Sequence, residues 1–187
     1  MGLKITAGSA KGRKLKGPKS AGIRPAAARV RESVFQILGD LEGQRVLDLF
    51  AGTGSMGLEA LSRGAATVDF VDPNQAAVSL LFHNLKLTGF GERAHVIKKK
   101  AIPAIEWLAR KAEPYDLIFL DPPYDMGHID ATLKQLDRHP LLAEDGLLLC
   151  EHSPRERPAF LGGLEVVDER KYGQTYVTFL KRKADAP

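Results

Sequence analysis

The sequence is poor in the residues that make disulfide-bonded or metal-stabilised folds. Among its 187 residues there is one cysteine, Cys150, which excludes an internal disulfide and a cysteine-based metal cluster. No apolar run approaches the ~18 residues that a transmembrane helix needs. The basic N-terminus lacks the apolar stretch of a signal peptide. These absences predict a cytosolic protein that neither spans a membrane nor holds a metal ion.

Acidic residues are missing from residues 1–31, which carry nine lysines and arginines. The rest of the chain has eighteen basic and twenty-three acidic residues, a net charge of −5. A basic segment on an acidic body is typical of proteins that bind a polyanion, although many basic termini are only solvated. Ile5, Leu15 and Ile23 are interleaved with turn residues, which favours an ordered small β element. The side chains that we expect to bind phosphates are Lys11, Arg13, Lys14, Arg24, Arg29 and Arg31.

The pattern of apolar residues changes near residue 40. Before it, short strands are expected near 3–7 and 12–16, and a helix opened by Pro25 is expected to reach Leu38. We therefore separate a basic N-terminal extension, residues 1–40, from a larger domain, residues 41–187.

Strands and helices alternate in the larger domain, which predicts an α/β fold with a mostly parallel sheet covered on both faces. The expected strands are 45–50, 67–71, 94–97, 116–120 and 146–151. The expected helices are 56–63, 75–87, 102–111 and 129–136. Two last strands, 164–170 and 175–181, are joined by a tight connection and predict an antiparallel hairpin at the sheet edge.

A glycine-rich loop joins the first strand of this domain to its first helix. Gly52, Gly54 and Gly57 fit the dinucleotide pattern G-x-G-x-x-G, and Asp72 follows about 20 residues later. Asp48 argues against a dinucleotide, because a carboxylate just before the loop would repel a pyrophosphate and attract a cationic amino group. S-adenosylmethionine offers such an amino group and has no phosphate, so we expect Asp48 at its amino-acid end and Asp72 on its ribose. A nicotinamide-dependent oxidoreductase, or glycines that serve only tight packing, are the alternatives.

A second motif follows the strand at 116–120. Asp121, Pro122, Pro123 and Tyr124 form a stiff segment at the edge where open α/β sheets bind ligands. The carboxylate can accept a hydrogen bond from an amino group, and the tyrosine can stack on a flat ring. The motif therefore suits chemistry on the exocyclic nitrogen of a nucleobase. The alternative is a strand end followed by a proline-rich turn.

Together these segments resemble the bacterial 16S ribosomal RNA guanine-N2 methyltransferases, the RsmD family. The resemblance runs from about Ile5 to Leu180. The glycines of the stretch 48–65 and the Asp-Pro-Pro-Tyr motif are each shared with other families. Three upstream segments are more specific to the family: Gly12–Leu15, Arg24-Pro25 and Arg29–Glu32.

The resemblance implies a class I S-adenosylmethionine-dependent methyltransferase with a Rossmann-like, seven-stranded, mostly parallel sheet whose last strand is antiparallel. Residues 41–187 would be the methyltransferase domain and residues 1–40 an RNA-binding extension. The substrate would be the exocyclic N2 of a guanine in 16S ribosomal RNA, naked or in the assembling small subunit. For so compact a chain, a monomer is the default expectation. The residues assigned to the cofactor are Asp48, Phe50, Ala51, Gly52, Gly54, Gly57, Asp72, Pro73, Ala101 and Asp121.

The chain departs from the family at two places. Ala26-Ala27-Ala28 stand where relatives usually carry polar residues, so any contact made by those side chains is missing. Lys98-Lys99-Lys100-Ala101 stand where an acidic or amide residue often precedes alanine, near the adenine of the cofactor. An adenine contact must then come from the backbone or from another residue.

The expected reaction is an in-line transfer of a methyl group to an amine, which depends mainly on positioning. Asp121 and the Pro122 carbonyl would accept hydrogen bonds from the amine and stabilise the charge that develops on it. Tyr124 would stack on the flipped-out base. Adenine-N6 methylation, methylation of a protein glutamine amide and catalytically silent RNA binding are the other readings. The short chain leaves no room for a large DNA-recognition domain, which favours RNA.

Overall fold

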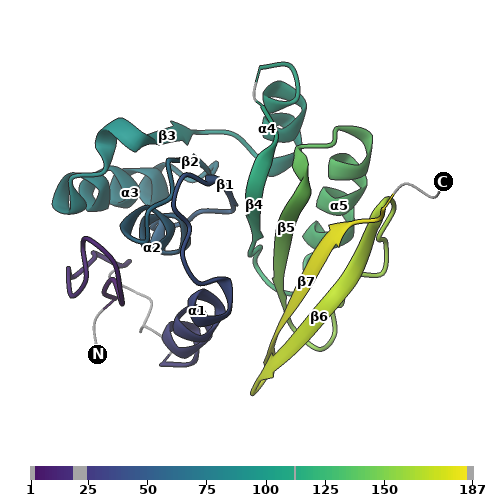
Figure 1. The fold of residues 1–187 in the computed structure, drawn as a ribbon, viewed down its shortest axis with the longest axis horizontal. Coiled ribbons are helices and arrows are strands. Elements are labelled where there is room, and N and C mark those ends of the chain that lie inside the picture. Colours follow the sequence, from purple (N-terminus) through teal and green to yellow (C-terminus); the bar gives the residue numbers. More distant parts are fainter. Residues whose placement is uncertain (1–2, 19–24, 112, 185–187) are drawn as a thin grey trace.

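The alternating strands and helices build one central sheet (Figure 1). The computed structural model describes residues 3–18, 25–111 and 113–184, and within these ranges the sheet has seven strands in the order β3-β2-β1-β4-β5-β7-β6. The strands are β1 (Arg45–Leu49), β2 (Thr67–Val71), β3 (Ala94–Ile97), β4 (Tyr115–Leu120), β5 (Leu142–His152), β6 (Leu164–Tyr172) and β7 (Thr175–Arg182).

The first five strands pair in parallel, and β7 pairs antiparallel with both β5 and β6. The predicted parallel sheet and C-terminal hairpin are therefore confirmed. The last strand, β7, lies inside the sheet, and β6 forms the edge (yellow and yellow-green in Figure 1).

Helices cover both faces of the sheet and create two apolar layers. Helices α1 (Pro25–Leu38), α2 (Ser55–Ser62) and α3 (Gln75–Thr88) pack on one face. Helices α4 (Ala101–Leu108) and α5 (His128–Arg138) pack on the other, and a short 3-10 helix, η1 (Gly91–Arg93), precedes β3. Over the described residues no helix is long and apolar enough to cross a membrane.

Neighbouring residues of a strand point to opposite faces of the sheet, so the two layers fix the direction of each side chain. Phe119 of β4 and Leu149 of β5 belong to the layer under α1, α2 and α3. Leu120 and Cys150, one residue later on each strand, belong to the layer under α4 and α5. This alternation decides where the polar residues that end these strands point.

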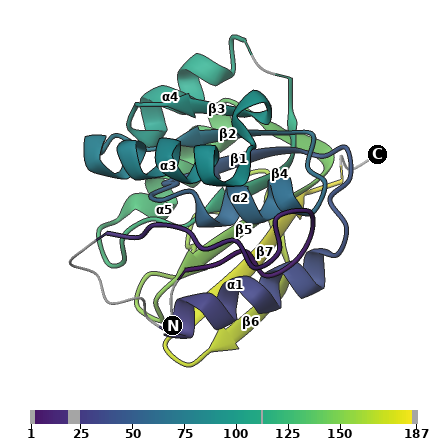
Figure 2. The same cartoon turned by 90° about the vertical axis from the view of Figure 1, so that its left-hand side faces the viewer.

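The N-terminal extension forms the predicted small β element. Lys4 and Lys14 make an antiparallel bridge, and the Ile5 amide donates to the Arg13 carbonyl at 3.0 Å. Ile5 and Leu15 are buried in the same apolar layer as α2 and α3. Figure 2 shows this purple segment running between α2 and α1. The described part of the extension therefore shares its core with the larger domain.

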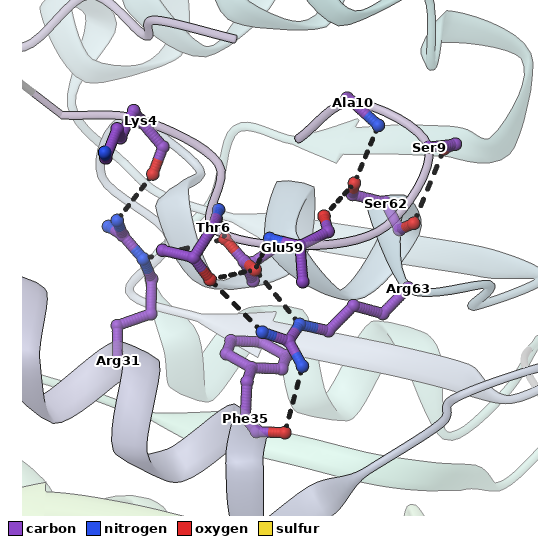
Figure 3. Close-up of polar contacts among 10 residues, drawn as sticks. Lys4, Thr6, Ser9, Ala10, Arg31, Phe35, Glu59, Ser62 and Arg63 are labelled. Carbon is purple, nitrogen blue, oxygen red and sulfur yellow. Dashed lines mark hydrogen bonds and ion pairs between the residues drawn. The ribbon is translucent and has the colours of Figure 1, made fainter. Parts of the chain in front are cut away.

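A buried carboxylate fastens the extension to helix α2 (Figure 3). Glu59 has no exposed surface and accepts hydrogen bonds from the Thr6 amide at 2.8 Å and the Ala7 amide at 3.1 Å. It also pairs with Arg63, whose Nε lies 3.0 Å away, and with Arg31, whose Nε lies 3.9 Å away. The stretch around Glu59 that carries the family resemblance thus has a structural task, which is to hold the extension.

Candidate active site

The glycine-rich loop folds tightly over the ends of β1 and β2. The Ala51 amide donates to the Val71 carbonyl at 2.9 Å, and the Gly54 amide donates to the Ala51 carbonyl at 2.8 Å. The Gly52 amide donates to the Asp72 carboxylate at 2.8 Å. Phe50 adopts a left-handed backbone conformation with φ of 64°, which is uncommon for a residue other than glycine.

The three glycines of the loop have different tasks. A Cβ on Gly54 would lie 2.3 Å from Leu81, and a Cβ on Gly57 would lie 2.3 Å from Phe70. These two glycines are needed for the close packing of α2 against β2 and α3. Gly52 has φ of 57°, and its Cβ would have no neighbour closer than 4.0 Å, so its backbone faces open space. Of the three, only Gly52 has the surroundings expected of a glycine that lets a ligand approach.

Asp48 is buried at the end of β1 beneath the first turn of α2. Its carboxylate accepts a hydrogen bond of 3.0 Å from the Gly57 amide. The pKa of Asp48 is raised to about 7, mainly by burial and also by the negative charge of Asp72, against the lowering effect of the Gly57 hydrogen bond. A buried carboxylate of this kind is stabilised by a nearby cation. The cationic amino group of S-adenosylmethionine could supply this charge, and the assignment of Asp48 to it stays a prediction.

Asp72 follows β2 and is 9% exposed. One of its oxygens accepts from the Gly52 amide and the other from the Asn74 amide, each at 2.8 Å. A carboxylate offers about four lone-pair sites, so Asp72 can hold the loop and also accept a ribose hydroxyl. The contact of Asp72 with the ribose stays a prediction.

The other residues predicted for the cofactor surround the same edge of the sheet. Ala51 is buried beside the loop, and the Phe50 ring lies 5.5 Å from the His128 ring. Pro73 is exposed after Asp72, and Ala101 is buried at the start of α4.

Asp121 directly follows β4, the strand that pairs with β1 and its Asp48. In the β1–β4 register Asp48 pairs with Phe119, two residues before Asp121. Because Phe119 points to the layer under α1, α2 and α3, Asp121 points to the same face. It lines a pocket there with Val34 of α1 and Met56 of α2. The aspartate of the Asp-Pro-Pro-Tyr motif and the cofactor loop thus share one side of the sheet.

Tyr124 is fixed by two residues that the sequence analysis did not predict. Its hydroxyl donates to Glu151 of β5 at 2.6 Å and lies 3.1 Å from the hydroxyl of Thr175 on β7. Burial, followed by the charge of Glu151, raises the pKa of Tyr124 above its usual value, so the hydroxyl keeps its proton. Glu151 also lines the Asp121 pocket. A polar residue directly after the apolar run 147–150 was the signal that could have revealed it.

The backbone after the motif is held by the loop that follows β5. Asp125 has φ of 58°, its amide donates to Glu156, and its carboxylate accepts from the Ser153 hydroxyl at 2.6 Å. Within the motif Pro122 is buried and Pro123 is exposed. These contacts hold the backbone directly after Tyr124 in place.

The structure separates the predicted phosphate-binding residues. Lys11, Arg13 and Lys14 are exposed in the extension, and Arg29 is exposed on α1. Arg24 lies outside the described residues. The prediction for Arg31 is wrong: this side chain is 5% exposed, donates to the Lys4 carbonyl at 2.8 Å and pairs with Glu59 (Figure 3). Its guanidinium is used inside the protein and is not available to a phosphate.

Comparison with known proteins agrees with this geometry. The family described as "Conserved hypothetical protein 95" matches residues 3–181. The chain is 37% identical over 183 residues to the "Putative rRNA methyltransferase YlbH" of Bacillus subtilis, which covers 97% of this chain and 100% of that protein. It is also 37% identical over 150 residues to the "Ribosomal RNA small subunit methyltransferase D" of Escherichia coli, covering 80% of this chain and 74% of that protein.

Among solved structures, the "Putative methyltransferase yhhF from Escherichia coli" superposes with a TM-score of 0.84 at 30% identity, covering 98% of this chain and 99% of that one. The fold is that of the class I S-adenosylmethionine-dependent methyltransferases, with the expected seven-stranded sheet in the described residues. The chain therefore belongs to the RsmD family of methyltransferases.

Proposed function

We propose that this protein transfers the methyl group of S-adenosylmethionine to the exocyclic N2 of a guanine in small-subunit ribosomal RNA. The observation that carries the proposal is the place of Asp121, one strand away from Asp48 and the glycine-rich loop and on the same side of the sheet. When bound, S-adenosylmethionine supplies a methyl group that its sulfonium charge has already activated.

The residues of the chain then have to orient the two partners. Asp48 and Asp72 hold the amino-acid and ribose ends of the cofactor, and Gly52 lets the backbone approach it. Asp121 accepts a hydrogen bond from the amine of the base and stabilises the positive charge that forms on the nitrogen. Such a donor–acceptor contact at a developing charge is worth about 10²–10³ in rate. Tyr124 presents its ring to the base, and stacking of this kind contributes about 1–3 kcal/mol.

The exposed basic residues bind the RNA backbone. Lys11, Arg13 and Lys14 lie in the extension, and Arg29 lies on α1, the helix whose Val34 also lines the Asp121 pocket. Phosphate contacts near the pocket position the RNA without choosing a base. The target guanine leaves its stack to enter the site, as bases must when an enzyme acts on them. We place this activity in the cytoplasm, on 16S ribosomal RNA or on the assembling small subunit.

The test is methyl transfer from radiolabelled S-adenosylmethionine to 16S RNA, to small subunits and to DNA, with mass spectrometry of the product nucleosides. We expect N2-methylguanosine from one of the RNA substrates and none from DNA. Formation of N6-methyladenosine, or binding of NAD without binding of S-adenosylmethionine, would overturn the proposal.

Asp121→Ala tests the catalytic assignment. We expect transfer to fall by at least about 10²-fold while calorimetry shows nearly unchanged cofactor affinity. Asp116→Asn is the matched control, because Asp116 is exposed on the same strand and its carboxylate accepts the Arg45 amide. An equal loss of transfer and cofactor binding in Asp121→Ala would remove Asp121 from the catalytic role.

A further inference from the structure

Two carboxylates stand side by side in the pocket. Leu120 of β4 pairs with Cys150 of β5, so the residues that follow them, Asp121 and Glu151, are neighbours across the two strands. Leu120 and Cys150 point into the layer under α4 and α5. The next residue on each strand therefore points to the opposite face. Both side chains accordingly line the pocket under α1 and α2.

The orientation of Glu151 is set by a short chain of hydroxyl groups. Tyr124 has one hydroxyl proton, which it donates to Oε1 of Glu151 at 2.6 Å. The hydroxyl of Thr175, 3.1 Å from Tyr124, must then be the donor in that contact. Oε1 of Glu151 therefore faces Tyr124. This orientation also sets the direction of the second carboxylate oxygen of Glu151.

A carboxylate has about four acceptor sites, so two adjacent carboxylates fit a ligand edge with two adjacent donors in addition to their contacts within the protein. Of the bases that carry an exocyclic amine, guanine has a ring N1–H beside its N2 amine. Adenine and cytosine have a ring nitrogen that accepts hydrogen bonds beside theirs. A carboxylate oxygen facing such a nitrogen would receive no hydrogen bond from it and would repel its lone pair, which disfavours these bases.

We propose that Glu151 is the residue that selects guanine, by accepting a hydrogen bond from N1–H while Asp121 accepts one from the N2 amine. The inference rests on the proposed function, because it names how the same pocket recognises its base. In this arrangement Tyr124 stacks on the base and also orients the Glu151 carboxylate, which accepts a hydrogen bond from the Watson–Crick edge of the base. Recognition of unstacked bases by their Watson–Crick edge is the usual way in which proteins read single-stranded RNA.

The simpler reading is that Glu151 only anchors Tyr124. The two readings differ for a base that keeps the N2 amine but lacks N1–H, and 2-aminopurine is such a base. Its N1 is an acceptor, so a carboxylate at this position rejects it. In Glu151→Gln, the Tyr124 hydroxyl keeps the amide oxygen on its own side, so the amide nitrogen takes the place of the second carboxylate oxygen. This group donates to N1 of 2-aminopurine and cannot accept from N1–H of guanine.

The experiment first maps the methylated guanine with the wild-type protein and then uses RNA with guanine or 2-aminopurine at that position. We expect the wild type to prefer guanine by roughly 10²-fold or more in kcat/KM. Glu151→Gln should lower transfer to guanine and raise transfer to 2-aminopurine, which reverses the preference. Tyr124→Phe keeps the carboxylate, so it should slow both substrates and retain the preference for guanine.

Three outcomes bear on the inference. A reversed preference in Glu151→Gln supports it. An equal fall in transfer to both bases in Glu151→Gln would show that Glu151 only anchors Tyr124. A wild-type protein that methylates 2-aminopurine as efficiently as guanine would overturn the inference, even if the variant failed to fold. Failure of the proposed function looks different, because the wild type would then form no N2-methylguanosine on any RNA.

Discussion

The backbone amide of Gly57 donates a hydrogen bond of 3.0 Å to the carboxylate of Asp48. This contact ties the first turn of α2 to the end of β1, and it offers little compensation for burying a charge. Burial raises the pKa of Asp48 to about 7. The free protein at neutral pH is therefore divided between a protonated and an ionised Asp48, and a cationic ligand would favour the ionised form.

Cofactor affinity should consequently depend on pH. Below pH 7 a proton must leave Asp48 before the cofactor amino group can pair with it, so affinity should rise by roughly tenfold from pH 6 to pH 7.5. Calorimetry over this range, which stays below the pKa of a free amino group near 8, measures the change. Asp48→Asn should bind more weakly and lose the pH dependence. A flat profile for the wild type would contradict the assignment.

The stability of the cofactor-free protein should show the opposite effect. The pKa of Asp48 is higher in the folded state than its ordinary value of 3.8, so its contribution to stability is greatest at low pH and is lost as pH rises toward 7. Asp48→Asn should therefore raise the melting temperature more at pH 8 than at pH 4. An equal change at both pH values would show that the buried charge is not responsible.

Arg29 and Arg31 provide a matched pair for RNA binding. Arg29 is exposed on α1, whereas Arg31 is buried against Lys4 and Glu59. Arg29→Gln should reduce the slope of log K against log salt by about 0.7–0.9, the loss of one phosphate contact. Arg31→Gln should lower the melting temperature and leave this slope unchanged. An unchanged slope for Arg29→Gln, measured by fluorescence anisotropy, would exclude Arg29 from the RNA contact.

Glu59 should matter for stability more than any exposed carboxylate. Glu59→Gln leaves the guanidinium of Arg31 buried without its charged partner, and breaking a buried pair costs about 3–5 kcal/mol. For a chain of this size, the melting temperature should fall by roughly 10 °C, and residues 3–16 should become sensitive to proteases. Glu92→Gln, at an exposed position of η1, is the control. Similar melting temperatures for the two variants would show that Glu59 does not hold the extension.

Gly57 should contribute to the stability of the fold and not to ligand binding. An added Cβ would lie 2.3 Å from Phe70 and 2.8 Å from Val68, so Gly57→Ala should destabilise the protein by about 1–3 kcal/mol although alanine favours helices. Gly91→Ala is the comparison, since its Cβ would meet nothing within 4 Å. Urea unfolding of both variants without cofactor tests this, and equal midpoints would disprove the packing role.

The secondary structure and the place of the site followed from the sequence because both depend on local patterns. Alternating apolar segments gave the strands and helices, and β5 was the main difference, since it begins at Leu142 and not near Gly146. The extra residues pair with the start of β4 through Leu142 and Tyr115, across an irregular register that the sequence did not reveal. The motifs that end β1, β2 and β4 were expected to meet because parallel strands bring their carboxyl ends to one edge.

The linear sequence determined the element types, the glycine-rich loop and the Asp-Pro-Pro-Tyr motif, since each depends on residues that are neighbours in the chain. The tertiary structure alone decided that Arg31 is buried while Arg29 is exposed, that Gly54 and Gly57 serve packing, and that Glu151 stands beside Asp121. These properties depend on residues that are distant in the chain. The task of a charged or small side chain is set by what the folded chain places against it, and spacing along the sequence does not contain that information.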